Sequence, residues 1–265
     1  MLIKIIIINA IIFLLLRIIA VGAALSGHLE IIDNILAFVQ LPGTLAALLT
    51  RPWTILTYMF SHYDPTHILF NMLWLYWFGS IFMTLNQPWR LLPLYLYGGI
   101  AGAAVYLMAG AVTGAAGLIG ASAAVIAIVT ATAMMAPEFS VRLFLIGNIK
   151  LKWIAVITIG IDILSLWGSD LGGPIAHLGG ALLGLIYALA LRQGTDLAIP
   201  LKKLADRFSL SRRTNTPPRT APSSSLENVD DILDKIKRSG YTSLTNHERQ
   251  ILFGASRRQN DDNKT

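Results

Sequence analysis

An almost unbroken apolar run over residues 3–25 constrains the possible folds of this chain more than any other sequence feature. A helix of about 20 apolar residues crosses the hydrocarbon core of a bilayer, so the run predicts a first transmembrane helix. A secretory signal peptide is the alternative, because Lys4 precedes the apolar stretch. The run is longer than a usual signal core and contains Arg17, which favours the transmembrane helix. We expect Arg17 to face other helices or to reach toward an interface, since a charge facing lipid is costly.

The composition of the chain is typical of a membrane protein. Apolar residues make up 54% of the 265 residues and charged residues 14%, well below the roughly 25% usual in soluble domains. The chain has no cysteine, which excludes disulfides, thiolate metal sites and a cysteine nucleophile. The net charge is +6, but the basic residues gather in loops and in the tail, a pattern that orients membrane proteins. We therefore expect no nucleic-acid partner.

Five further apolar stretches follow the first and predict a membrane domain of six helices. They cover residues 65–84, 91–112, 120–136, 151–167 and 174–192. Residues 26–63 are too interrupted to span, and we expect interfacial helices there, with Trp53 and Tyr58 at headgroup level. The predicted fold class is all-α: a polytopic membrane protein with six transmembrane helices over residues 1–192 and a small helical cytoplasmic tail.

The basic residues predict which side of the membrane each loop faces. The loops after the first, third and fifth spans, at residues 26–63, 111–118 and 168–173, hold a single basic residue, Arg51. The opposite side carries Lys4, Arg90, Arg142, Lys150, Lys152, Arg192, Lys202 and Lys203. By the positive-inside rule both termini are cytoplasmic. We expect a multi-pass protein of a bacterial cell (inner) membrane.

The chain changes character after residue 192. We expect a basic linker rich in Ser, Pro and Thr over residues 193–226, an amphipathic helical pair over 227–258 and a disordered tail over 259–265. Gly240 is placed to end the first helix of the pair. Residues 245–248 form a capping box for the second helix. The sequence names no partner for this tail.

Polar residues mark the starts of the second, fourth and sixth spans, which all run from the outer to the inner side. His67 is the third residue of its span, and Asn71 lies one turn further along the same face. Ser122 lies in the first turn of the fourth span, and His177 is the fourth residue of the sixth. A rise of 1.5 Å per residue puts all four within roughly 10 Å of depth. Because ionisable groups inside a membrane are functional by default, we expect these residues to form one site near the outer face.

The four residue types suit hydrolysis by an activated serine. The Ser122 hydroxyl is a poor nucleophile near neutral pH and needs a base within hydrogen-bond reach, a role open to His177. A tetrahedral oxyanion needs preorganised donors, which the Ser122 amide at a helix start and the His67 and Asn71 side chains can supply. Taken singly, a serine in an apolar helix is usually bonded to a carbonyl one turn back, and a glycine-rich helix is usually a packing surface. Their convergence at one depth favours catalysis.

Three motifs resemble those of the rhomboid intramembrane serine proteases, over about residues 3–192. The family's Gly-x-Ser-Gly is present as Gly120-Ala121-Ser122-Ala123, and its His and Asn four apart are His67 and Asn71. Its Ala-His-x-x-Gly-x-x-x-Gly motif is matched by residues 176–184. The resemblance implies a Ser122–His177 dyad without a third acid, with oxyanion stabilisation by His67 and Asn71.

The resemblance also implies what surrounds the site. Close helix packing there is assigned to Gly120, Gly180 and Gly184. The substrates would be transmembrane proteins, cleaved near the outer face and admitted from the bilayer past the fifth helix and last outer loop, about residues 151–173. No cofactor and no metal are implied.

The sequence departs from the family pattern at three positions. Ala123 replaces the glycine after the serine, and Thr54 follows Trp53 where the family has arginine, which leaves the anchoring of the first loop open. Asp162 lies within the fifth span, and we expect a structural hydrogen bond or a cavity-lining group there rather than tuning of His177.

Two rival functions remain open. An inactive relative that binds transmembrane clients is the first, although the intact Ser122 and His177 argue against it. A transporter is the second, but it predicts inverted repeats and polar groups near the midplane. The chain shows no such repeat, and its polar groups cluster near one face.

Overall fold

Four long helices carry most of the apolar sequence. The computed structural model describes residues 1–110, 117–143, 147–168, 171–213, 224–239, 244–245 and 247–252, and divides into two compact units, residues 1–206 and 207–265. Within these residues, four segments are long and apolar enough to cross a membrane. They are α1 (Leu2–Ser26), α5 (Pro65–Leu85), α6 (Leu91–Met108) with the preceding 3-10 turn η2 (Pro88–Arg90), and α10 (Gly172–Arg192).

Two further apolar helices are too short to match a bilayer core. α8 (Ser122–Met135) has 14 residues and α9 (Leu151–Ser165) has 15. At 1.5 Å per residue these lengths are about 21 and about 22 Å, against about 30 Å of hydrocarbon. The predicted number of six spans is therefore not established by helix length, and it stays a prediction.

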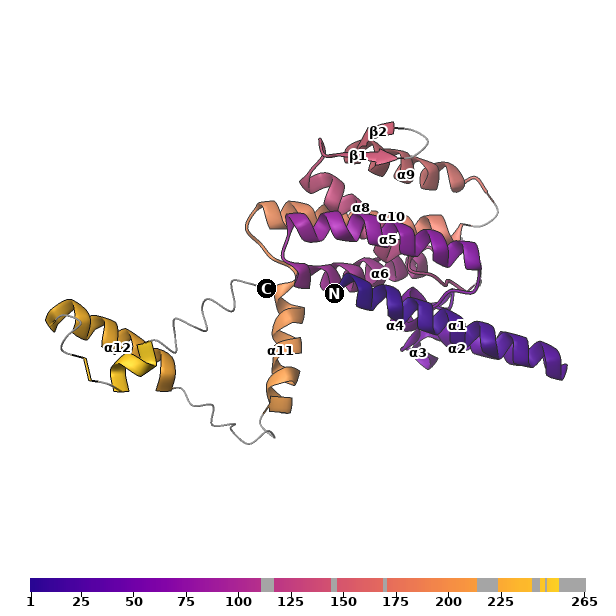
Figure 1. Cartoon of the computed structure of the whole chain (residues 1–265). Coiled ribbons are helices and arrows are strands. Elements are labelled where there is room, and N and C mark those ends of the chain that lie inside the picture. Colours follow the sequence, from indigo (N-terminus) through magenta and orange to yellow (C-terminus); the bar gives the residue numbers. More distant parts are fainter. Residues whose placement is uncertain are drawn as a thin grey trace. The chain divides into compact units, whose positions relative to one another are not determined.

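The first unit is organised around α8. Every residue of α8 from Ala123 to Ala133 is buried. The helix packs against α5, α6, α9 and α10, and Figure 1 shows α9 at one edge of this group. Since protein rather than lipid surrounds α8, a short helix is tolerated at this position.

The connection between α1 and α5 folds into short helices. These are α2 (Glu30–Val39), α3 (Leu45–Thr50), α4 (Thr54–Thr57) and the 3-10 turn η1 (Tyr58–Phe60). Trp53 is partly exposed, and its ring N–H donates to the carbonyl of Phe38 at 2.9 Å. The expectation for Tyr58 is wrong: its side chain is 1% exposed and its hydroxyl donates to the carbonyl of Gly99 on α6. Tyr58 is a core residue because α6 offers it both packing surface and a hydrogen-bond acceptor.

The first loop is anchored although Thr54 stands where the family has arginine. The Thr54 hydroxyl donates to the Arg51 carbonyl at 2.6 Å, and the Arg51 guanidinium donates to the carbonyl of Ala37 in α2.

Arg17 in α1 also faces protein, as expected, with its guanidinium 5.2 Å from the centre of the Tyr63 ring.

The first unit is mostly helical, as predicted, but the α8–α9 connection also contains a small β-hairpin that the sequence analysis did not include. β1 (Ser140–Leu143) pairs antiparallel with β2 (Gly147–Lys150). At the base of the hairpin Glu138 accepts from the side chains of Lys150, at 2.6 Å, and Lys152. The hydrogen bonds from these two lysines lower the pKa of Glu138 to about 2. The strands are too short for alternation of apolar and polar residues to reveal them.

The part of the chain after residue 192 contains more helix than expected. α11 (Ile199–Arg213) lies in the stretch predicted as a linker, residues 214–223 lie outside the described residues, and α12 runs over Ser224–Ser239. The capping box is confirmed, because the Thr245 hydroxyl accepts from the Glu248 amide and the Glu248 carboxylate accepts from the Thr245 amide. Gly240 and residues 253–265 lie outside the described residues. The predicted limits of the tail stay a prediction.

Candidate active site

The backbone before α8 presents Ser122 at the first helical position. Gly120 has a φ of 125°, which a side chain would strain, and a Cβ there would lie 2.5 Å from the His67 ring. The stretch is held in place by paired hydrogen bonds of 2.9 Å between Leu118 and Leu41, and by one of 3.0 Å from the Gly120 amide to the Tyr58 carbonyl. Ser122 follows at the helix start, where amide groups are not used by the helix itself.

The start of α5 folds as its sequence predicts. Asp64 caps the helix by accepting from the His67 amide at 2.7 Å, and Pro65 occupies the first helical position. One turn further along, Asn71 is buried, and its side-chain amide donates to the His67 carbonyl at 3.0 Å. The amide nitrogen of Asn71 also lies 3.2 Å from His62 Nε2. The Asn71 side chain is thus held by protein groups at the edge of the site.

His62 is a site residue that the sequence reasoning missed. It is fully buried, and its Nε2 accepts from the Ala121 amide, directly before the serine, at 3.2 Å. Burial, and after it the nearby His67, lowers the pKa of His62 well below its usual value, so the ring stays neutral and keeps its acceptor nitrogen. A second histidine five residues before His67 was the available signal, but sequence spacing does not show that it reaches the serine loop.

His177 pairs with an acidic residue of α9. α10 begins at Gly172, two residues earlier than expected, so His177 is its sixth residue rather than its fourth. His177 Nδ1 lies 2.7 Å from Asp162 Oδ1, and both side chains are largely buried. Asp162 is thus hydrogen-bonded and lines the cavity, as expected, and its partner is the imidazole of His177. The contact arises because α9 packs against α10 and brings Asp162 opposite the imidazole.

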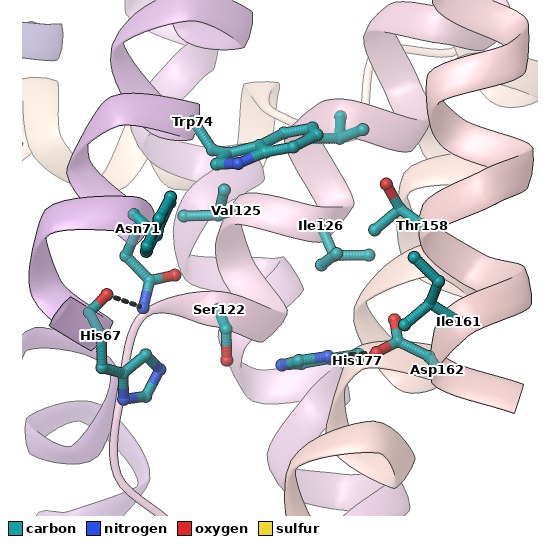
Figure 2. A pocket seen from close by; sticks show the side chains of 12 residues that line it. His67, Asn71, Trp74, Ser122, Val125, Ile126, Thr158, Ile161, Asp162 and His177 are labelled. Carbon is teal, nitrogen blue, oxygen red and sulfur yellow. Dashed lines mark hydrogen bonds and ion pairs between the residues drawn. The ribbon is translucent and has the colours of Figure 1, made fainter. Parts of the chain in front are cut away.

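These side chains surround one cavity of about 310 Å³. Its lining residues are His67, Phe70, Asn71, Trp74, Ser122, Val125, Ile126, Val129, Thr158, Ile161, Asp162 and His177. In the view of Figure 2 the Ser122 hydroxyl lies between the His67 ring and the His177 ring. The four residues predicted at one depth, from three separate helices, thus line the same cavity.

The hydrogen bonds of the described residues do not include one between Ser122 and His177. Catalytic hydrogen bonds are often long or poorly aligned in unliganded enzymes and tighten when substrate binds. Transfer of a proton between these two side chains requires such a closer approach.

Glycines set the distance between α8 and its neighbours. A Cβ on Gly98 or Gly102 of α6 would lie 2.5 Å from the methyl groups of Ala127 or Ala123. A Cβ on Gly180 of α10 would lie 2.1 Å from the Ala123 carbonyl oxygen, and one on Gly184 would lie 2.3 Å from that of Ala127. Close approach of this kind is typical of small residues in membrane helices. It brings the helix of His177 against the helix of Ser122.

Comparison with known proteins identifies the domain that contains this site. A family model described as "Rhomboid domain" matches residues 49–194, more than half of the chain. A second model, a family of unknown function (DUF6576), matches residues 224–258. "RHOMBOID-like protein 12, mitochondrial" from Arabidopsis thaliana is 32% identical over 161 residues, which are 54% of this chain and 48% of that protein.

A second relative comes from an animal. "Presenilin-associated rhomboid-like protein A, mitochondrial" from Danio rerio is 28% identical over 173 residues, which are 62% of this chain and 43% of that protein. The chain thus matches less than half of the length of either relative. Both names contain the word mitochondrial, which argues against the expected bacterial cell membrane. The orientation of the termini stays a prediction.

Proposed function

Because the chain belongs to the rhomboid family, we propose that it is a serine endopeptidase that hydrolyses peptide bonds of transmembrane proteins. One observation carries the proposal. Ser122, His177, His67 and Asn71 come from three separate helices and line a single cavity that is otherwise mostly apolar. Thr158 and Asp162 also line this cavity, and so many polar groups in a membrane protein's interior are costly unless they have a use.

Ser122 is the proposed nucleophile and His177 the proposed base. Asp162 occupies Nδ1 of His177, which leaves Nε2 to face the serine. The Ser122 oxygen forms a bond to the substrate carbonyl carbon as Nε2 takes the hydroxyl proton, and the carbonyl π electrons move onto its oxygen. The intermediate then collapses, and His177 returns the proton to the leaving amine. Water hydrolyses the acyl-enzyme by the same steps, so the cavity must be open to water.

The developing oxyanion would be stabilised from two directions. The Ser122 amide lies at a helix start, where the dipole favours negative charge. On the opposite wall His67 and Asn71 offer side-chain N–H groups. The Asn71 amide currently donates within the protein, to the His67 carbonyl. Its contribution therefore requires one of its two hydrogens to turn toward the substrate.

The site would face the outer side of a six-span protein whose termini lie inside. In this arrangement α8 crosses the membrane enclosed by other helices, whereas α9 lies at the edge of the bundle, and each is shorter than the hydrocarbon core. The uneven distribution of Lys and Arg between the loops supports the orientation.

Substrates would enter the cavity from the bilayer beside α9. α9 packs against α8 and α10 less extensively than α10 packs against α8. It carries exposed apolar side chains, among them Val156, Ile157 and Leu164, that suit contact with lipid or with a transmembrane segment. The substrate helix must unwind to expose a carbonyl, so glycine or proline near the cut would lower that cost.

A fluorophosphonate probe, which bonds to activated serines, tests the proposal. Purified wild type in detergent should be labelled, and mass spectrometry of the peptides should find the adduct on Ser122. Ser122→Ala and His177→Ala should not react. Ser165→Ala is the matched control, because the Ser165 hydroxyl lies at the end of α9 and donates to the Ile161 carbonyl. An unlabelled wild type, or a Ser122→Ala protein that labels equally, would favour a client-binding relative without activity.

A further inference from the structure

The position of Asp162 is unusual for an acidic residue. It lies within α9, between the apolar residues Ile161 and Ile163, and is 7% exposed. A buried carboxylate in an apolar helix costs free energy unless a specific partner compensates it. The groups that Asp162 contacts must therefore explain why a carboxylate is tolerated at this position.

The contact of Asp162 is with the imidazole of the proposed base. Its Oδ1 lies 2.7 Å from His177 Nδ1, on the side of the ring away from Ser122 (Figure 2). Its Oδ2 is buried and has no hydrogen-bond partner among the described residues. Among the described residues, the His177 imidazole is therefore the hydrogen-bond partner of this carboxylate.

We propose that Asp162 is a positioning residue that completes a Ser122–His177–Asp162 triad, in place of the dyad that the family resemblance implied. This inference rests on the proposed function. Asp162 accepts the Nδ1 proton of His177, which fixes the ring orientation and leaves the Nε2 lone pair directed at the serine. When Nε2 takes the Ser122 proton, the carboxylate stabilises the imidazolium and does not itself become protonated.

The other groups near His177 do not supply this function. His67 of α5 lines the cavity on the other side of Ser122 (Figure 2), so it is not placed to accept from Nδ1. α8 contributes Ser122 and the apolar Val125, Ile126 and Val129 to the cavity. Within the residues that line the cavity, Asp162 is the acid that accepts from the base.

Steady-state cleavage by Asp162→Asn tests the inference. The asparagine has the same shape, so α9 can pack as before, but the charge is lost and the amide can donate to Nδ1 and favour the wrong tautomer. Because Asp162 orients the base and does not hold the substrate, kcat should fall by a factor on the order of 10² with KM within about twofold. The rate of fluorophosphonate labelling should fall in parallel. Asp162→Ala should be at least as slow, and Ser165→Ala should match wild type.

The outcomes separate a positioning role from a structural one. Loss of kcat at unchanged KM and unchanged melting midpoint supports the triad. A kcat for Asp162→Asn within about twofold of wild type overturns it, as does a rise in KM with a lowered melting midpoint, since α9 would then be misplaced. Failure of wild type itself to label at Ser122 would overturn the proposed function and this inference together. Labelling of wild type and of Asp162→Asn at the same rate would overturn the inference alone.

Discussion

Replacing Gly180 by alanine should slow cleavage while leaving the protein folded, because the added methyl group would overlap the backbone of α8. The new Cβ would lie 2.1 Å from the Ala123 carbonyl oxygen and 2.9 Å from its carbon. Real Cβ atoms essentially never approach another heavy atom closer than 3.0 Å. Because the new Cβ would lie 2.1 Å from the carbonyl oxygen, α10 must move away from α8 by at least about 0.9 Å. A backbone carbonyl inside a buried helix cannot turn aside as a flexible side chain can.

Two opposing energies determine the effect of Gly180→Ala on stability. Overpacking a close interface typically costs about 1–3 kcal/mol, and alanine is about 1 kcal/mol more favourable than glycine in a helix interior. The net loss is therefore at most about 2 kcal/mol. Activity is more sensitive, because His177 lies one turn before Gly180 on α10 and moves with it, and a displacement of about 1 Å can cost about 10²-fold in rate.

The assay for Gly180→Ala compares cleavage rate and thermal midpoint in detergent with those of Gly22→Ala. Gly22 lies in α1, where an added Cβ meets nothing within 4 Å, so this variant carries the helix-propensity gain without the overlap. Gly22→Ala should match wild type in rate. A Gly180→Ala protein with wild-type turnover would show that the Ser122–His177 geometry does not depend on the α8–α10 spacing, and would refute the reasoning.

Three further predictions follow from the site and from the tail. Asn71→Ala should lower kcat about 10²-fold or more with little change in KM, because removing one oxyanion donor weakens only the transition state; steady-state kinetics would measure the split. Between about pH 7 and about pH 5, the thermal midpoint of wild type should fall more than that of His62→Gln. The pKa of His62 is lowered in the folded protein, so the stabilisation is complete above its unfolded pKa of about 6.5 and is lost as the pH falls. Glutamine can accept from the Ala121 amide without titrating. Truncation after Arg213, at the end of α11, should leave cleavage of a generic substrate in place, because residues from 207 onward form a separate compact unit.

Each of these predictions has a clear contrary result. Wild-type turnover of Asn71→Ala would assign that residue to structure alone and require other oxyanion donors. Equal pH dependence of the two midpoints would mean that His62 does not titrate as its burial implies. Complete loss of cleavage after truncation, with membrane insertion normal, would make the tail part of the enzyme.

The features of the fold that depend on local sequence were predictable. Apolar runs of sufficient length gave α1, α5, α6 and α10, and the Asp64 cap with Pro65 after it gave the start of α5 to the residue. The capping box around Thr245 was likewise visible, because its hydrogen bonds lie within one helical turn. Period, length and capping are properties that a segment carries by itself.

The features that depend on tertiary packing were not predictable. Tyrosine is a residue type common at membrane interfaces, but the hydroxyl of Tyr58 donates to a carbonyl of α6 and its side chain is buried. His62 and Asp162 differ from other polar residues only in what the fold sets against them, the Ala121 amide and the His177 imidazole. The short length of α8 has the same origin, since its neighbours rather than the bilayer enclose it. The position of each residue along its helix predicted that Ser122, His67 and His177 would lie at one depth. Which way each helix is turned, and which side chains touch across the helices, could be read only from the structure.

Cleavage of a transmembrane substrate in proteoliposomes is the direct test of whether Ser122 hydrolyses peptide bonds in a membrane. Full-length wild type and Ser122→Ala would be reconstituted at equal amounts with a single-span substrate that carries glycine near the outer end of its helix. Wild type should convert the substrate to two fragments whose new termini, identified by mass spectrometry, lie within or next to the membrane segment. Ser122→Ala should leave the substrate intact. Fragments formed equally by Ser122→Ala, or the absence of fragments with a wild type that is folded and inserted, would contradict the proposed function.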